Sequence, residues 1–230
     1  MPNASPNATP ALKAFKSAAH RTPTGRPSKR HATSKSSETR SAIIAATLRC
    51  FHRDGYFRTN MSTVAKEANV TRGCMQYYFP STEALLEAAA EQLVEHLFGS
   101  MTRAAHNAPP GANLLEHHID MALNAAHSRQ YQILIELMAA ARTEPMLRPI
   151  LARVMLVFDH LRMQLSHELF GDEGKAHLPH YRAAADLVTI MAAGSTIFIL
   201  PQNSRARLEA LREPLKDQVF KLWDVPRKKR

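Results

Sequence analysis

The chain has 230 residues, of which 45% are hydrophobic, so it is long enough to bury a substantial core. Its formal net charge is +10, and the cations gather at its two ends. Residues 1–40 sum to +7, residues 41–80 to +3, residues 81–226 to −4 and the last four residues to +4. This pattern predicts an anionic partner for the N-terminal part, with solubility as the alternative explanation for the four-residue tail.

Hydropathy argues against a membrane-spanning chain, and the positions of the cysteines favour free thiols over a disulfide. The longest apolar run, residues 187–200, has 14 residues and includes polar ones, whereas a membrane-spanning helix needs about 20. The two cysteines, Cys50 and Cys74, fall inside predicted helices, which favours free thiols in a reducing compartment. We therefore expect a cytoplasmic protein with no membrane partner.

Residues 1–37 are basic, rich in Pro, Ser, Thr and Ala, and almost without large apolar side chains. This composition is typical of disorder. We expect a flexible basic arm that contacts phosphate groups, or an over-extended start site, and an organelle transit peptide is a third interpretation. Residues 227–230 form a separate basic tail.

The segment after the arm is predicted to contain three helices. Ser37 or Thr39 is expected to cap the first, which ends at Asp54-Gly55 because glycine suits a left-handed cap. Asn60 is a good cap for a second helix of about eight residues, after which Asn69 provides the turn.

The third helix, capped by Thr71, belongs to the stretch VTRGCMQYYF at residues 70–79. Met75 and Phe79 are four residues apart and should both point into the core. The outward side would then carry a guanidinium, an amide, a phenol and a glycine gap, from Arg72, Gln76, Tyr77 and Gly73. Glycine suits a place where the backbone approaches a phosphate, and Gln and Arg can read bases. The pattern therefore indicates a helix-turn-helix at about 60–79, with an ordinary bundle surface as the alternative.

The sequence from Thr39 to about Leu86 resembles the TetR family of bacterial transcriptional regulators. TRSAIIAATLRCFHRDGY at 39–56 is similar to the first helix of that family, and TNMSTVAKEANVTRGCMQYYFPSTEAL at 59–85 is similar to its helix-turn-helix and the start of its fourth helix. The resemblance implies DNA-contacting roles for nine positions, namely Ser62, Thr63, Thr71, Arg72, Gly73, Gln76, Tyr77, Tyr78 and Thr82. Gln76 is the expected base reader, while Tyr78 has core packing as its alternative role.

Three positions depart from the family pattern. Asn69 replaces the usual turn glycine, which Asn can imitate. Gln76 stands where tyrosine is common, and Thr82 stands where the family usually has a lysine that meets the DNA backbone. We expect these two residues to alter operator preference or to weaken the grip on DNA.

The C-terminal part is predicted to be helical, with helices at about 81–98, 114–127, 131–142, 143–170, 181–200 and 205–223. The motif GDEG at 171–174 should end the fourth of these, and Pro214 should kink the last or split it at Glu213. The resemblance implies a homodimer whose last two helices pair in a four-helix bundle and whose central helices enclose a small effector. Candidate pocket residues are Met121, Met138, Met155, Phe158 and Met163, with plain core packing as the alternative for each.

We predict an all-α chain with an N-terminal three-helix DNA-binding domain and linking helix at 38–98, and a C-terminal effector-binding and dimerisation domain at 99–226. The expected function is a dimeric repressor released from a pseudo-palindromic operator by a small molecule. A constitutive or architectural DNA-binding protein is the alternative. Because no catalytic triad or metal-ligand spacing can be assembled, an enzyme, a metal site or a cofactor is not expected.

Overall fold

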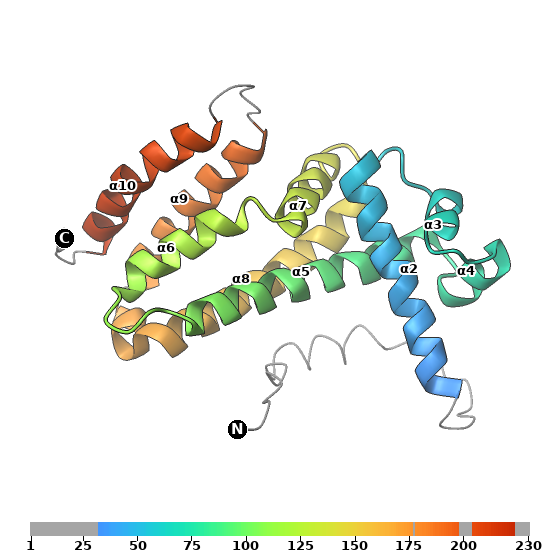
Figure 1. Cartoon of the computed structure of the whole chain (residues 1–230), viewed down its shortest axis with the longest axis horizontal. Helices are drawn as coiled ribbons and strands as arrows, with labels where there is room; N and C mark the ends of the chain where they lie inside the picture. The colour runs from blue at the N-terminus through green and yellow to red at the C-terminus, as the bar shows by residue number, and fades with distance from the viewer. Residues whose placement is uncertain (1–31, 177, 198–203, 224–230) are drawn as a thin grey trace. The chain divides into compact units, whose positions relative to one another are not determined.

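The computed structural model describes residues 32–176, 178–197 and 204–223, and these contain α-helices and no strand, which confirms the all-α prediction (Figure 1). Residues 1–31 of the predicted arm and the tail at 227–230 lie outside the described residues. The helices in chain order are α2 (Ala32–Asp54), α3 (Met61–Glu67), α4 (Arg72–Tyr78), α5 (Thr82–His106), α6 (Leu114–Ala125), α7 (Arg129–Ala140), α8 (Leu147–Ala176), α9 (Leu178–Ile197) and α10 (Ser204–Leu222).

The start of α2 differs from the prediction and its end agrees with it. α2 already includes Ala32, so neither Ser37 nor Thr39 caps it. Residues 32–39 contain no glycine or proline, and a potential capping side chain does not stop a helix that can continue past it. At the other end Gly55 has a φ of 77°, and its N–H donates to the carbonyl of Phe51 at 3.0 Å.

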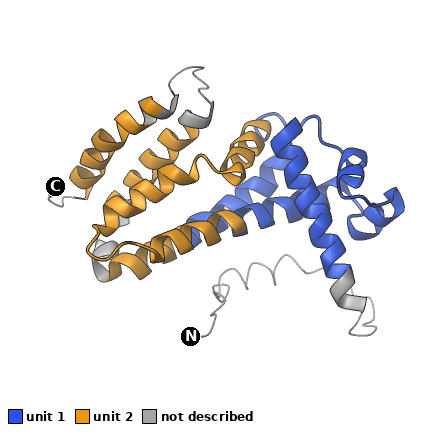
Figure 2. Ribbon diagram, in the orientation of Figure 1, with its two compact units in different colours: residues 1–95, 141–161 blue, residues 96–140, 162–230 orange. Residues whose placement is uncertain are grey.

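The chain is divided into two compact units (Figure 2). Unit 1 comprises Met1–Glu95 and Ala141–Leu161, and unit 2 comprises His96–Ala140 and Arg162–Arg230. The helices α5 and α8 each contribute residues to both units.

Unit 1 contains the three helices of the predicted DNA-binding region. α3 packs on α2 and on α4. Its fully buried side chains include Ile43 of α2, Val64 of α3 and Met75 of α4, and Phe79 at the end of α4 is also buried. A core of this kind holds the two short helices in one orientation, because neither is long enough to be stable alone.

Unit 2 is organised around α9, which packs against α6, α7 and α10. Leu115 and Ile119 are four residues apart, so they lie on the same face of α6. There they meet Val188 of α9 and Val219 of α10 in one buried cluster. Trp223, the only tryptophan of the sequence, belongs to this cluster and follows the last residue of α10.

Three helix ends in the C-terminal part depart from prediction or refine it. α5 continues past Phe98 to His106, since no strong helix breaker occurs before the Pro-Gly loop that follows. α8 is interrupted at Gly171, as GDEG predicts, with a φ of 58°. α10 is not split at Glu213: Pro214 lies inside it on an exposed side, where water can replace the missing N–H donor.

Cys50 is buried and Cys74 is half-buried, and both are free thiols, as predicted. Among the described residues, none of the helices combines the length and the apolar character that crossing a membrane would require.

Candidate nucleic-acid interface

α3 begins with a reciprocal cap that fixes its first turn. The side-chain oxygen of Asn60 accepts from the N–H groups of Ser62 and Thr63, both at 3.0 Å. In return the Thr63 hydroxyl accepts from the Asn60 N–H at 2.9 Å and donates to the Asn60 carbonyl at 2.8 Å. Thr63 is therefore engaged in the cap, whereas its neighbour Ser62 is exposed.

The turn between α3 and α4 is set by one left-handed residue. Asn69 has a φ of 54°, the one positive φ of a non-glycine residue in the described part of the chain. The N–H of Val70 then donates back to the Ala65 carbonyl at 3.0 Å. Thr71 follows as the cap of α4, and its hydroxyl oxygen accepts from the Cys74 N–H at 3.1 Å. These local bonds confirm the predicted turn and both predicted caps.

α4 has one buried side and one exposed side. Met75 and Phe79 are each 1% exposed, and the guanidinium of Arg40 lies 5.1 Å from the centroid of the Phe79 ring. Tyr77 is 79% exposed. Its ring packs edge-on against that of Tyr78, with 5.1 Å between the ring centroids. Tyr78 is half-buried, which is compatible with both roles predicted for it. The remaining outward residues of α4, all exposed, are Arg72, Gly73 and Gln76.

Gly73 is not required by the packing of the chain. A β-carbon built at this position would meet no atom within 4 Å, and its φ is not positive. Neither crowding nor backbone strain therefore explains a glycine there. A glycine at this exposed position leaves room for another molecule to approach the backbone closely.

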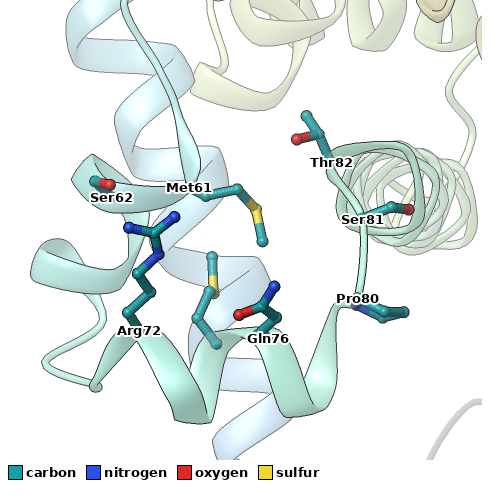
Figure 3. A pocket seen from close by; sticks show the side chains of 8 residues that line it. Met61, Ser62, Arg72, Gln76, Pro80, Ser81 and Thr82 are labelled. Carbon is teal, nitrogen blue, oxygen red and sulfur yellow. The ribbon is translucent and has the colours of Figure 1, made fainter.

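A hollow of about 210 Å³ collects four of the predicted residues (Figure 3). They are Ser62, Arg72, Gln76 and Thr82, and the lining is completed by Met61, Met75, Pro80 and Ser81. Arg72 and Gln76 rise from α4 on the side that faces α3 (Figure 3). The hollow is called the front hollow below.

The front hollow is lined by side chains that can donate hydrogen bonds to an anion. Its lining includes one guanidinium, one carboxamide and hydroxyl groups, and no carboxylate. Ser81 uses its hydroxyl oxygen to accept from the Ala84 N–H at 3.1 Å, which starts α5 at the rim. Such a donor-rich surface can bind phosphate oxygens, while the amide and guanidinium can pair with base edges.

The other five predicted residues lie outside the lining of the front hollow: Thr63, Thr71, Gly73, Tyr77 and Tyr78. Thr63 and Thr71 use their hydroxyls to cap helices, a structural role that the family resemblance does not reveal. Met61, which is not among the predicted site residues, also lines the front hollow and is half-buried. Pro80 and Ser81, which follow α4 directly, also line the front hollow. Because proline and serine are common at helix boundaries, this pair could have indicated the edge of the site from the sequence.

An exposed ionic network ties α2 to α3. Glu67 of α3 accepts from Arg49 Nε at 2.8 Å and from Arg53 Nη1 at 2.8 Å. These hydrogen bonds hold the pKa of the Glu67 carboxyl below its ordinary value, and the bond from Arg53 has the larger effect. Arg53 also lowers the pKa of Asp54 through its hydrogen bond. The network links α2 to α3 and pairs the carboxylates of Glu67 and Asp54 with arginine side chains.

The five candidate effector residues are distributed over both units. Met155 and Phe158 belong to unit 1, while Met121, Met138 and Met163 belong to unit 2. Met121 is buried and Met163 packs against the core of unit 2, whereas Met138 is 43% exposed. Among the described residues, no group of three or more His, Cys, Asp or Glu side chains could hold a metal ion.

Comparison with known proteins places the front hollow inside a recognised sequence region. Residues 43–89 match the family described as "Bacterial regulatory proteins, tetR family". The chain is also similar to the HTH-type transcriptional regulator BetI of Burkholderia mallei (strain NCTC 10229), at 36% identity over 73 residues, which cover 30% of this chain and 37% of BetI. The match therefore spans well under half of that relative.

Solved structures extend the likeness to most of the chain. GusR of Salmonella enterica shares 20% identity, with 81% of this chain and 96% of GusR covered and a TM-score of 0.60. The multidrug binding protein EbrR complexed with ethidium shares 22% identity, with coverages of 82% and 99% and a TM-score of 0.58. At these identities the likeness establishes the fold.

Proposed function

We propose that this chain, which belongs to the TetR family of bacterial regulatory proteins, is a homodimeric repressor that binds a pseudo-palindromic DNA operator and is released by a small-molecule effector. The observation that carries the proposal is the exposed face of α4. Arg72, Gly73 and Gln76 present a guanidinium, an open backbone and an amide beside the front hollow, while Met75 and Phe79 anchor the helix from behind.

DNA binding is assigned to α3 and α4 together. Arg72, Ser62 and Thr82 suit phosphate oxygens because they offer donors without a neighbouring carboxylate in the lining. Gln76 suits a base edge, since a carboxamide can pair with adenine in two places. Tyr77, which is 79% exposed, is a further phosphate donor.

Dimerisation is assigned to α9 and α10. These helices leave large apolar side chains exposed, with Ile190 at 70%, Leu187 at 36% and Leu211 at 49%. Pairing with the same helices of a second copy would remove them from water. Two recognition helices could then enter successive major grooves, about 34–36 Å apart.

An effector is the regulatory part of the proposal. EbrR, one of the similar structures, was solved with ethidium and, separately, with imidazole. In this chain Met121 is buried and Met163 packs against the core of unit 2, and we propose that both contact the ligand through their adaptable thioether side chains. Release from DNA requires that the effector bind one state of the dimer more tightly than the other.

Selection of bound fragments from a random DNA library, repeated with a panel of metabolites, tests the proposal. A discrete palindrome that is lost with one metabolite is expected. Sequence-independent coverage at every ligand condition would instead support a constitutive or architectural DNA-binding protein held by basic segments. Binding as a monomer, measured by sedimentation on operator DNA, would contradict the dimer.

Gln76→Ala tests the assignment of the base reader. We expect a loss of about 1–3 kcal/mol in binding free energy at one base position, with relaxed preference there. Gln132→Ala, which removes an exposed amide from α7, is the matched control and should leave base preference unchanged. Equal weakening by Gln76→Ala on every sequence would show that Gln76 does not read a base.

A further inference from the structure

Unit 1 contains a second hollow, of about 220 Å³, which is called the aromatic hollow below. Its floor is apolar and buried, with Phe51 of α2, Val64 of α3 and Leu85 and Leu86 of α5 each at most 4% exposed. None of the five candidate effector residues lines it. The aromatic hollow is therefore separate from the proposed effector site, and it shares Thr82 with the proposed DNA contact.

Aromatic rings form one wall of this hollow. The centroid of the Tyr56 ring lies 6.0 Å from that of the Phe51 ring, which is tilted against it. It lies 5.2 Å from the centroid of the Phe57 ring, which packs edge-on. Phe57 also lines the hollow and is 67% exposed, so a ligand can reach its side chain from solvent. Clustered ring faces carry negative electrostatic potential and attract cations.

Glu144 is the one charged side chain among the described residues that line the hollow. Its carbonyl accepts from the N–H groups of Leu147 and Arg148 at 3.2 and 3.3 Å, which holds it at the start of α8. The described residues supply no hydrogen bond or ion pair to its carboxylate. The nearby guanidinium of Arg148 is occupied by the carbonyls of Ala141 and Arg142, at 3.4 and 3.0 Å.

The Glu144 carboxylate interacts electrostatically with Tyr56 in the aromatic wall. Burial first, and the negative charge of Glu144 second, raise the pKa of the Tyr56 phenol. Glu144 is thus close enough to Tyr56 for its charge to be felt there, and the two groups can face one ligand together.

We propose that the aromatic hollow binds a small organic monocation with an apolar surface, of the tetraalkylammonium type. The rings and the carboxylate favour positive charge, and the buried floor favours alkyl groups over a strongly hydrated ammonium or metal ion. The volume of about 220 Å³ limits the ligand to a small one.

The site is coupled to the DNA-contacting surface through shared walls. Met61 and Thr82 line both the aromatic hollow and the front hollow that contains Arg72 and Gln76. A ligand that moves either side chain changes the shape offered to DNA on its other side. The size of this effect is the difference in ligand affinity between the DNA-bound and free states.

Titration of the full chain, labelled with ¹³C in its methionine methyl groups, tests the site without DNA. Tetramethylammonium chloride should give a saturable shift of the Met61 resonance, assigned with Met61→Leu, and leave Met121 and Met163 unchanged. Sodium chloride and the neutral tert-butanol should give no saturable shift. An equal response to tert-butanol, or shifts confined to Met121 and Met163, would overturn the proposal.

Variants then test the two recognition elements. Glu144→Gln should weaken tetramethylammonium binding at least about fivefold, and Phe57→Leu should weaken it about twofold to fivefold. Glu168→Gln, at an exposed position of α8, is the matched control and should leave the affinity unchanged. Unchanged affinity in both Glu144→Gln and Phe57→Leu, with circular dichroism confirming folded protein, would overturn the site.

Coupling is measured by fluorescence anisotropy with a bound DNA fragment. Tetramethylammonium should shift the DNA dissociation constant of the wild-type chain, and the shift should shrink in Glu144→Gln. A ligand that binds but does not shift the constant would refute the coupling. Because the titration requires no DNA, failure of the cation site and failure of the proposed DNA binding are distinguishable.

Discussion

α4 and α10 carry the two proposed contacts of the chain, one with DNA and one with a second copy, yet they are stabilised in different ways. α4 has seven residues, and its start is set by the adjacent Thr71. α10 has 19 residues with Pro214 inside. It is held from α6, where Asp120 meets Arg212 Nη1 and Lys216 Nζ, each at 2.8 Å, across 92 and 96 positions of sequence.

This difference shows where each kind of substitution should act. The outward residues of α4 are exposed and contribute little to the core, so changing them should alter binding more than stability. α10 places Leu215, Val219 and Phe220 in the core of unit 2, so changing those residues should alter stability first. Four predictions test the comparison, from the largest expected effect to the smallest.

Leu215→Ala should lower the free energy of unfolding of unit 2 by about 3 kcal/mol, because a nearly buried side chain leaves a cavity. Urea unfolding followed by the fluorescence of Trp223 measures this loss. Leu211→Ala on the same helix is the matched control, since Leu211 is 49% exposed. Its cost should be smaller and should depend on protein concentration if Leu211 lies in the dimer interface. Equal costs would break the comparison.

The stability of unit 2 should fall between pH 6.5 and pH 4. Burial first, and then the charges of Arg162 and His117, lower the pKa of His118 to about 4. The unfolded chain therefore binds a proton in this range that the folded chain does not, and stability is lost as pH falls. The loss at pH 4 should be roughly 2–3 kcal/mol.

His118→Phe isolates this contribution, because the new ring can still meet Phe170, whose ring centroid is now 6.3 Å from that of His118. The unfolding free energy of the variant, measured at several pH values, should vary less across the range. An unchanged slope would assign the acid sensitivity to other groups.

Asp120→Ala should cost about 2 kcal/mol, because it leaves the Lys216 ammonium, with a side chain only 7% exposed, without its closest carboxylate. Glu209→Ala removes a 54% exposed partner of Arg212 and should cost much less. Chemical unfolding of both variants at low and high salt compares the two effects. A larger loss for Glu209→Ala would mean that exposure does not rank these ion pairs.

Gly73→Ala should leave stability unchanged or raise it by less than about 1 kcal/mol, because the new methyl group has free space and alanine is the better helix former. DNA affinity should nevertheless fall, since the methyl group occupies the place of an approaching backbone. Anisotropy with operator DNA and thermal unfolding separate the two effects. Unchanged affinity would show that nothing approaches Gly73.

The fold of the N-terminal part was predictable because its signals act over a few residues. Asn60 caps α3, Asn69 takes a positive φ and Gly55 ends α2, and each needs only its near neighbours. The same reasoning placed the start of α2 too late and made α5 too short. Cap and end signals state where a helix can stop, and tertiary packing decides whether it does.

The sequence predicted which residues belong to the candidate site, but it did not predict which of them lie together. The resemblance supplied Ser62, Arg72, Gln76 and Thr82, and the front hollow brings these four together. It did not indicate that Thr63 and Thr71 use their hydroxyls in caps. Hydroxyl partners depend on backbone geometry that residue identity alone does not specify.

The sequence by itself determined the helical periodicity, the chain-reversing turn and the residue types on the outer face of α4, because these follow from interactions within one or two helical turns. Only the tertiary structure decided that Glu144 lines the same hollow as the rings of Tyr56 and Phe57, that Asp120 binds α10, and that Met61 and Thr82 line two hollows. Those contacts join residues far apart along the chain, and no local pattern records which of many distant partners will pack together.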